Sequence, residues 1–156
     1  MTFDDDVRDL YQEVILDHGR KPRYGHRLAA YDVTAKGDNP MCGDRVEVFV
    51  KLGEDGTIAE TGFEARGCAI SVASADLMAE TVQGRGKADA RALFETFREL
   101  VRTGICPEHD AALDESLERL APLAGVHEYP SRVKCATLPW HALVAALDGA
   151  KEASSE

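Results

Sequence analysis

The stretch RVEVFVKL at residues 45–52 places an apolar side chain at every second position. Val46, Val48, Val50 and Leu52 share one side of an extended chain, and three of the four residues on the other side are charged. Strict alternation of this kind is typical of a strand that buries one face and leaves the other toward solvent. Residues 45–52 therefore predict a half-buried β-strand.

The neighbouring segments predict a small antiparallel sheet around this strand. Residues 53–56 read Gly-Glu-Asp-Gly and indicate a hairpin loop, so residues 57–66 are expected to return as the partner strand. Gly62 is the candidate for a bulge, because the apolar pattern changes phase there. Upstream, residues 30–35 predict a further strand, and the Gly-Asp-Asn-Pro at residues 37–40 predicts the turn after it.

Helical periodicity dominates the rest of the chain, where apolar residues recur at i, i+3, i+4 and i+7. Acidic residues 4–6 suit the start of the first helix, and Gly19 with Pro22 suits its end. A last helix is expected over about residues 139–147, with Pro139 in its first turn. The apolar faces are Val7, Leu10, Tyr11, Val14 and His18; Ile70, Ala73, Leu77 and Thr81; Leu93, Phe97, Leu100 and Val101; and Leu113, Leu117, Leu120 and Ala124.

Strands followed by helices, without β-α-β alternation, predict the α+β class: a small antiparallel sheet packed with helices. The 156 residues suit one domain, which we place at residues 1–150. The small, polar residues 151–156 predict a disordered tail.

Composition narrows the function. With 18 Lys+Arg against 28 Asp+Glu, the net charge is −10, which disfavours nucleic acid and anionic membrane surfaces as partners. The acidic N-terminus does not resemble a secretory signal, and no apolar run reaches the length of a membrane span. We therefore expect a cytoplasmic protein, whose cysteines serve as thiols, metal ligands or catalytic groups.

Four cysteines are present, at positions 42, 68, 106 and 135, and no two have the Cys-x-x-Cys spacing. Cys42, Cys68 and Cys135 fall at predicted junctions between elements, where side chains from separate segments can converge. Predicted helix N-termini at Cys68 and Cys135 favour the thiolate, which is both the nucleophile and the metal-binding form. Asp44 adds a carboxylate close to Cys42.

Three thiolates and one carboxylate are a suitable tetrahedral zinc set. The alternative reading of each cysteine is a small buried hydrophobic residue, and spacing alone does not exclude it.

Three motifs resemble those of the IscU/NifU-like iron–sulfur cluster assembly family. They are GDNPMCGD at residues 37–44, GCAIS at residues 67–71 and RVKCATLPW at residues 132–140. The three motifs are similar to those of the SufU branch of this family. The opening LYQEVILDH at residues 10–18 and the KPR at residues 21–23 also resemble that branch.

Two departures from the scaffold-type IscU pattern favour that branch. Scaffold-type members have a histidine ligand immediately before the third cysteine, and this chain has Lys134. Lysine is a poor zinc ligand when protonated, so Asp44 is expected to be the fourth ligand. An extra helical segment over about residues 108–124 resembles the SufU insertion. The resemblance covers about residues 5–149.

The resemblance implies a zinc-dependent sulfurtransferase. Such a protein accepts persulfide sulfur from a SufS-type cysteine desulfurase and relays it to downstream iron–sulfur assembly proteins. Cys42 is implied as the acceptor, and Cys42, Asp44, Cys68 and Cys135 as the zinc ligands, with Arg132 as an auxiliary residue near the site. The alternatives are a scaffold that binds a nascent iron–sulfur cluster and a structural zinc-binding module.

Cys106 has no counterpart among these motifs and is expected to be a thiol that binds no metal. Cys106 with His109 remains the alternative as a second, adventitious metal pair.

Overall fold

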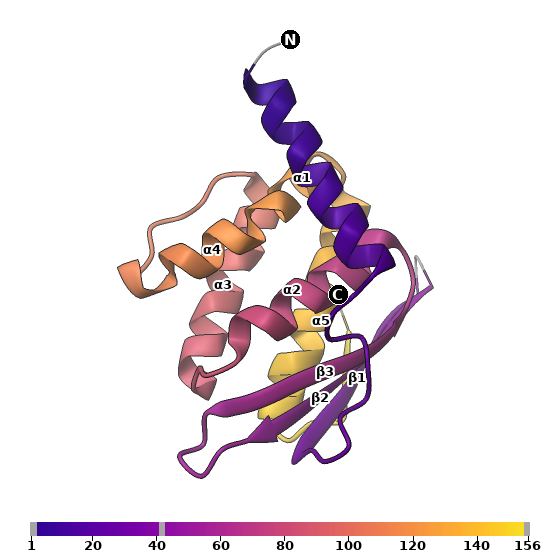
Figure 1. Ribbon diagram of the computed structural model, residues 1–156, viewed down its shortest axis with the longest axis vertical. Coiled ribbons are helices and arrows are strands. Elements are labelled where there is room, and N and C mark those ends of the chain that lie inside the picture. The colour runs from indigo at the N-terminus through magenta and orange to yellow at the C-terminus, as the bar shows by residue number, and fades with distance from the viewer. Residues whose placement is uncertain (1–2, 41–42, 155–156) are drawn as a thin grey trace.

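The computed structural model describes residues 3–40 and 43–154, and it confirms the α+β class (Figure 1). Figure 1 shows α5 against a twisted sheet, with α2 crossing it and α1 reaching beyond the other helices. The elements are α1 Phe3–Arg20, β1 Val33–Asn39, β2 Asp44–Leu52, β3 Ile58–Arg66, α2 Ala69–Val82, α3 Lys87–Thr103, η1 Ala111–Leu113, α4 Asp114–Leu120, η2 Ala121–Glu128, α5 Pro130–Leu147 and β4 Glu152–Ser154.

The sheet has the order β3-β2-β1-β4. The pairs β1–β2 and β2–β3 are antiparallel, and β4 runs parallel to β1. Val46, Val48 and Val50 point to the helical side, where they are fully or almost fully buried. The alternation at residues 45–52 therefore predicted both the strand and its buried face.

Phe49 lies on the opposite face of β2 and is also buried. The segment between α1 and β1 covers it. The Tyr31 ring lies 5.0 Å from the Phe49 ring, centroid to centroid, and the Arg27 guanidinium lies 5.0 Å from the Phe49 centroid. This connecting segment thus shields one aromatic side chain from water.

The predicted bulge at Gly62 is wrong. Gly62 pairs regularly with Phe49, and the irregularity lies at Lys51 and Leu52 instead. The glycine has a different purpose, because a Cβ atom there would meet the carbonyl oxygen of His26. The connecting segment can pack against β3 only where no side chain intervenes.

The predictions of a strand at residues 30–35 and of a turn at residues 37–40 both lie too close to the N-terminus. β1 begins at Val33 and continues through Gly37 to Asn39, so the residues expected to turn are mostly paired with β2. A Cβ atom at Gly37 would crowd Leu138 and Ala142 of α5. Gly37 therefore permits close packing of α5 on the sheet. From the sequence alone, this glycine was interpreted as part of a turn.

Two helical predictions also need correction. The last helix begins at Pro130, so Pro139 lies inside it and Pro130 occupies the first turn. The predicted helix around residues 108–124 is divided into η1, α4 and η2. Pro122 at the start of η2 lacks the N–H that a continuing α-helix requires, which explains this break.

The tail is partly ordered, because Glu152–Ser154 form β4 beside β1. The prediction of a disordered tail is therefore wrong for these three residues, and the domain boundary at residue 150 stays a prediction. Among the described residues, no helix is both long and apolar enough to cross a membrane.

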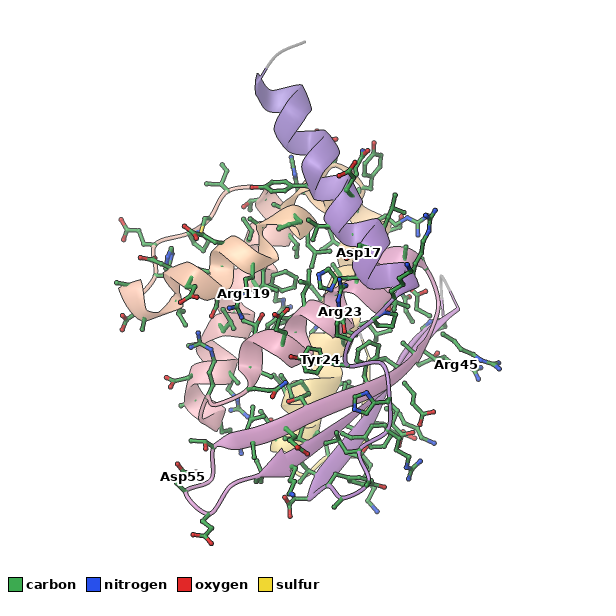
Figure 2. All side chains as sticks on the ribbon, viewed as in Figure 1. Asp17, Arg23, Tyr24, Arg45, Asp55 and Arg119 are labelled. Atoms are coloured by element: carbon green, nitrogen blue, oxygen red, sulfur yellow. The ribbon has the colours of Figure 1, made fainter. Side chains whose placement is uncertain are left out.

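Asp76 in α2 binds both α1 and the segment that follows α1. Its carboxylate is buried and lies 2.5 Å from Nδ1 of His18, and it accepts a hydrogen bond from the backbone N–H of Tyr24 at 2.8 Å. Figure 2 shows Tyr24 close to α2, and Asp17 and Arg23 at the end of α1. The ion pair of Asp17 and Arg23 is exposed, so Asp76 provides the stronger attachment.

Asp76→Ala is expected to lower the free energy of unfolding by about 2 kcal/mol, because it leaves a partly buried N–H and a partly buried imidazole without their acceptor. Urea denaturation at a fixed zinc concentration measures this change. The control Asp17→Asn alters only a solvated ion pair and should leave the midpoint unchanged. An Asp76→Ala protein as stable as the wild type would contradict this role.

Candidate metal centre

Three side chains from distant parts of the sequence meet at one end of the sheet. Asp44 begins β2, Cys68 precedes α2 and Cys135 lies in α5. One ligand atom from each residue lies within 4.8 Å of the others. Asp44 and Cys135 are buried and Cys68 is partly exposed, so the cluster is open toward solvent on one side.

The Asp44 carboxylate is held by the backbone that carries Cys68. Its Oδ1 accepts a hydrogen bond from the Cys68 N–H at 2.9 Å, and its Oδ2 lies 3.8 Å from the Cys68 Sγ. One oxygen is therefore used for orientation, and the other faces the sulfur. This is the arrangement expected of a metal-binding carboxylate fixed by a neighbouring donor.

Gly67 makes the approach of Asp44 sterically feasible. Its φ of 154° is unfavourable for other residues, and a Cβ atom there would overlap the Asp44 carboxylate. Sequence reasoning treated Gly67 only as part of a motif. A glycine between the end of a strand and a ligand-bearing helix start was the available signal.

Cys68 is the N-cap residue of α2, and its side chain caps none of the helix N–H groups. Its sulfur lies in the favourable field of the helix N-terminus, as predicted. The same prediction is wrong for Cys135, which is the sixth residue of a helix that begins at Pro130. Cys68 therefore lies at the N-terminus of its helix, and Cys135 lies beyond the first turn of its own.

Packing of α2 on α5 fixes how the two cysteines face each other. The hydroxyl of Ser74 in α2 donates to the Ala136 carbonyl oxygen of α5 at 2.5 Å, and Ser74 is fully buried. Ser74 was not singled out by the sequence, because nothing local marks a serine as an interhelical donor. Pro139 lacks the N–H that would bond to the Cys135 carbonyl, so α5 loses one helical bond beside its ligand.

The charges of the cluster favour a bound cation. Burial, followed by the hydrogen bond and negative charge of Asp44 and by Cys68, raises the pKa of the Cys135 thiol far above its usual range. Arg132, exposed on the same helix, faces these groups, and the negative charges of Cys68 and Cys135 raise the pKa of its guanidinium. A dication would relieve the repulsion between the three acidic groups.

The remaining predicted site residues are placed as follows. Cys42 lies outside the described residues, and its role stays a prediction. It directly precedes Gly43, whose N–H donates to the Asn39 carbonyl at 2.8 Å, and Asn39 pairs with Asp44. Cys106 is exposed on a different segment and does not belong to the cluster.

The donor set fits a borderline-soft metal ion. Two thiolates and one carboxylate oxygen are ligands that zinc uses in proteins, and they leave one of its four tetrahedral positions for a further ligand. Cysteine thiolates are equally the ligands of iron–sulfur clusters. The geometry thus supports metal binding by Asp44, Cys68 and Cys135 and leaves one position open for chemistry.

Gly67→Ala is expected to weaken zinc binding about tenfold, because the added methyl group pushes Asp44 away from the two sulfurs. Competition with a chromophoric zinc chelator measures this affinity. Gly125→Ala is the matched control, since a Cβ atom at Gly125 meets nothing within 4 Å and should leave the affinity unchanged. Equal affinities of the two variants would contradict the steric role of Gly67.

Comparison with known proteins finds relatives along almost the whole chain. The zinc-dependent sulfurtransferase SufU of Bacillus subtilis (strain 168) is 36% identical over 144 residues, covering 92% of each chain. The iron–sulfur cluster assembly scaffold protein IscU of Streptococcus pyogenes serotype M1 is 36% identical over 141 residues, covering 90% of this chain and 84% of that protein.

A solved structure from Fervidobacterium islandicum AW-1, described as an iron–sulfur cluster assembly scaffold protein for the SUF system, superimposes with a TM-score of 0.77. It is 30% identical, and the match covers 90% of this chain and 98% of that one. Residues 10–136 match the NifU-like N terminal domain, which includes Asp44, Cys68 and Cys135. The chain therefore belongs to the NifU-like N-terminal domain family of the IscU/NifU/SufU group.

Proposed function

We propose that this protein is a zinc-dependent sulfurtransferase that acts with a SufS-type cysteine desulfurase in iron–sulfur cluster assembly. The observation that carries the proposal is the pairing of a buried carboxylate, Asp44, with the sulfurs of Cys68 and Cys135. The similarity to SufU along almost the whole chain supports it. We expect it to work in the cytoplasm, where thiols stay reduced.

Cys42 is the proposed sulfur acceptor and the fourth ligand. Its thiolate attacks the outer sulfur of a persulfide on the desulfurase, the sulfur–sulfur bond of that persulfide breaks, and the desulfurase cysteine leaves as a thiolate. Cys42 then carries the persulfide for delivery to the downstream assembly proteins. Zinc, when bound, stabilises ionised thiolates at neutral pH.

The described residues prepare this transfer. Asp44, Cys68 and Cys135 bring three ligand atoms within 4.8 Å of one another, and we assign the fourth, exchangeable position to Cys42. Arg132 faces Cys68 and Cys135 from the exposed side of α5, where its guanidinium stabilises negative charge on a nearby sulfur. Lys134 occupies the position at which scaffold-type relatives have a histidine ligand. Because a protonated lysine is a poor zinc ligand, we assign that role to the carboxylate of Asp44.

A scaffold for a nascent iron–sulfur cluster is the second candidate. The same sulfurs suit iron, and relatives named IscU are 36% and 33% identical to this chain. A structural zinc-binding module is a third possibility and is disfavoured by the partly exposed Cys68.

The metal content of freshly purified protein separates these functions. We expect about one zinc per chain, as a four-coordinate site requires. Loss of a residue that only contacts a metal ligand typically reduces metal affinity about 10–100-fold. Asp44→Ala removes a ligand itself and should reduce zinc affinity by more than that. Asp38→Asn is the control, because Asp38 is an exposed carboxylate near the same strand end. Brown protein containing iron and sulfide would instead support the scaffold.

Sulfur transfer is tested with a SufS-type desulfurase and cysteine as substrate. The wild type should increase sulfide release, and mass spectrometry should find the persulfide on Cys42. Cys42→Ser should abolish both effects, and Cys106→Ser, which changes a cysteine outside the cluster, should preserve them. Full stimulation by Cys42→Ser protein, or stimulation by none of the proteins, would contradict the proposal.

A further inference from the structure

A second group of reactive side chains lies outside the metal cluster. Cys106, His109 and Asp114 belong to the segment that connects α3 to α4. The Cys106 Sγ lies 3.6 Å from the His109 Nδ1, and the His109 Nε2 lies 2.5 Å from the Asp114 Oδ1. A sulfur, an imidazole and a carboxylate are therefore arranged in series, the order in which a thiolate, an imidazolium and an orienting carboxylate pair.

The contacts of the His109 ring favour its doubly protonated form. Nε2 faces the Asp114 carboxylate, and Nδ1 lies 2.7 Å from the Pro107 carbonyl oxygen. Both neighbours only accept hydrogen bonds, so both ring nitrogens are expected to carry a proton. The Pro107 carbonyl first, and then the Asp114 side chain, raise the pKa of His109.

Other ionisable groups near this segment add to that effect or are remote from the ring. The negative charge of Asp110 contributes to the raised pKa of His109. Glu108 is exposed beside it in the chain. From η2, His127 packs against Gly104, and its Nδ1 lies 2.9 Å from the Ala124 carbonyl oxygen.

An imidazolium beside a sulfur stabilises the thiolate. Cys106 is also exposed, so a reagent in solution can reach its sulfur. The contrast with Cys135 is direct, since burial and two anionic neighbours raise the pKa of that thiol and hold it away from solvent. In this chain, an exposed thiol with a cationic neighbour is found at Cys106.

The two groups are spatially separate. In Figure 1 the connection from α3 to α4 lies at the left edge of the molecule, and the connection from β3 to α2, which carries Cys68, lies at the right. The group of metal-binding residues identified above includes neither Cys106 nor His109. The Cys106 group is therefore not a part of the metal centre.

We propose that Cys106 is a reactive thiol, activated by His109 and Asp114, that undergoes exchange with small disulfides. The Cys106 thiolate attacks one sulfur of the disulfide, the disulfide bond breaks and the second sulfur leaves as a thiolate. The product is a mixed disulfide on Cys106. The small disulfide is the oxidant, and no other co-reactant is required.

The rate of the exchange tests the proposal, with zinc-loaded full-length protein and 2,2′-dipyridyl disulfide as the probe. Near about pH 6.5, His109→Gln should slow the modification of Cys106 about threefold. The substitution removes the positive charge beside the Cys106 sulfur, and with it the stabilisation of the attacking thiolate. Asp114→Asn should slow it in the same direction, and Asp114→Glu should restore it.

The pH profile distinguishes activation from a merely structural effect. Near about pH 10 the imidazole is neutral and offers the sulfur no positive charge, so wild type and His109→Gln should react at equal rates. His26→Gln, which changes an exposed histidine elsewhere, should match the wild type at every pH. Peptide mapping should find the label on Cys106, and Cys106→Ser should remove it.

Two results would overturn the proposal. One is an equal rate for wild type, His109→Gln and Asp114→Asn at about pH 6.5. The other is a fall in rate of the same size at all pH values, which indicates altered access to the thiol. Zinc content and circular dichroism verify that each variant is folded. If His109→Gln does not fold, Asp114→Asn provides the same test.

Discussion

The metal centre depends on the packing of α2 and α5 against each other and against the sheet. α5 contacts β1 and β2, and α2 contacts β3, so both helices have fixed positions relative to the strand end that carries Asp44. The buried hydroxyl of Ser74 adds a directional contact between the two helices at the level of Ala136. Apolar burial provides the energy, and this polar contact fixes the register in which Cys68 and Cys135 approach each other.

This packing leaves an electrostatic cost that a metal ion offsets. A carboxylate with no exposed surface lies beside two thiols, and the Cys68 N–H is its hydrogen-bond donor. Buried acidic groups in such proximity cannot all ionise without a cation. The arrangement is thus more compatible with ligand binding than with stability alone, and Gly67 exists in a conformation that permits it.

Much of this was predictable from the sequence, and the errors have specific physical causes. The alternation in residues 45–52 identified the central strand and its buried face, and the motifs identified Asp44, Cys68 and Cys135 as companions. The start of α5 was misplaced because Pro139 was read as a helix start, whereas packing tolerates it within the helix. Glycines at positions 37 and 62 were read as turn or bulge signals, and only tertiary contacts reveal them as sites of close approach.

Cysteine identity alone does not determine chemistry in this chain; position relative to burial and charge does. Cys135 lies within a helix between anionic neighbours, where a thiol keeps its proton until a cation displaces it. Cys106 lies on an exposed connection, where the imidazole of His109 is held between two acceptors and offers positive charge to the sulfur. Local sequence around Cys106 contains the histidine and the aspartate, but the contacts of His109 with the sulfur and with Asp114 are a property of the folded connection. Cysteine can therefore serve as a metal ligand in one part of this molecule and as a solvent-facing nucleophile in another. The neighbours of Cys135 are anionic, and the neighbour of Cys106 is cationic.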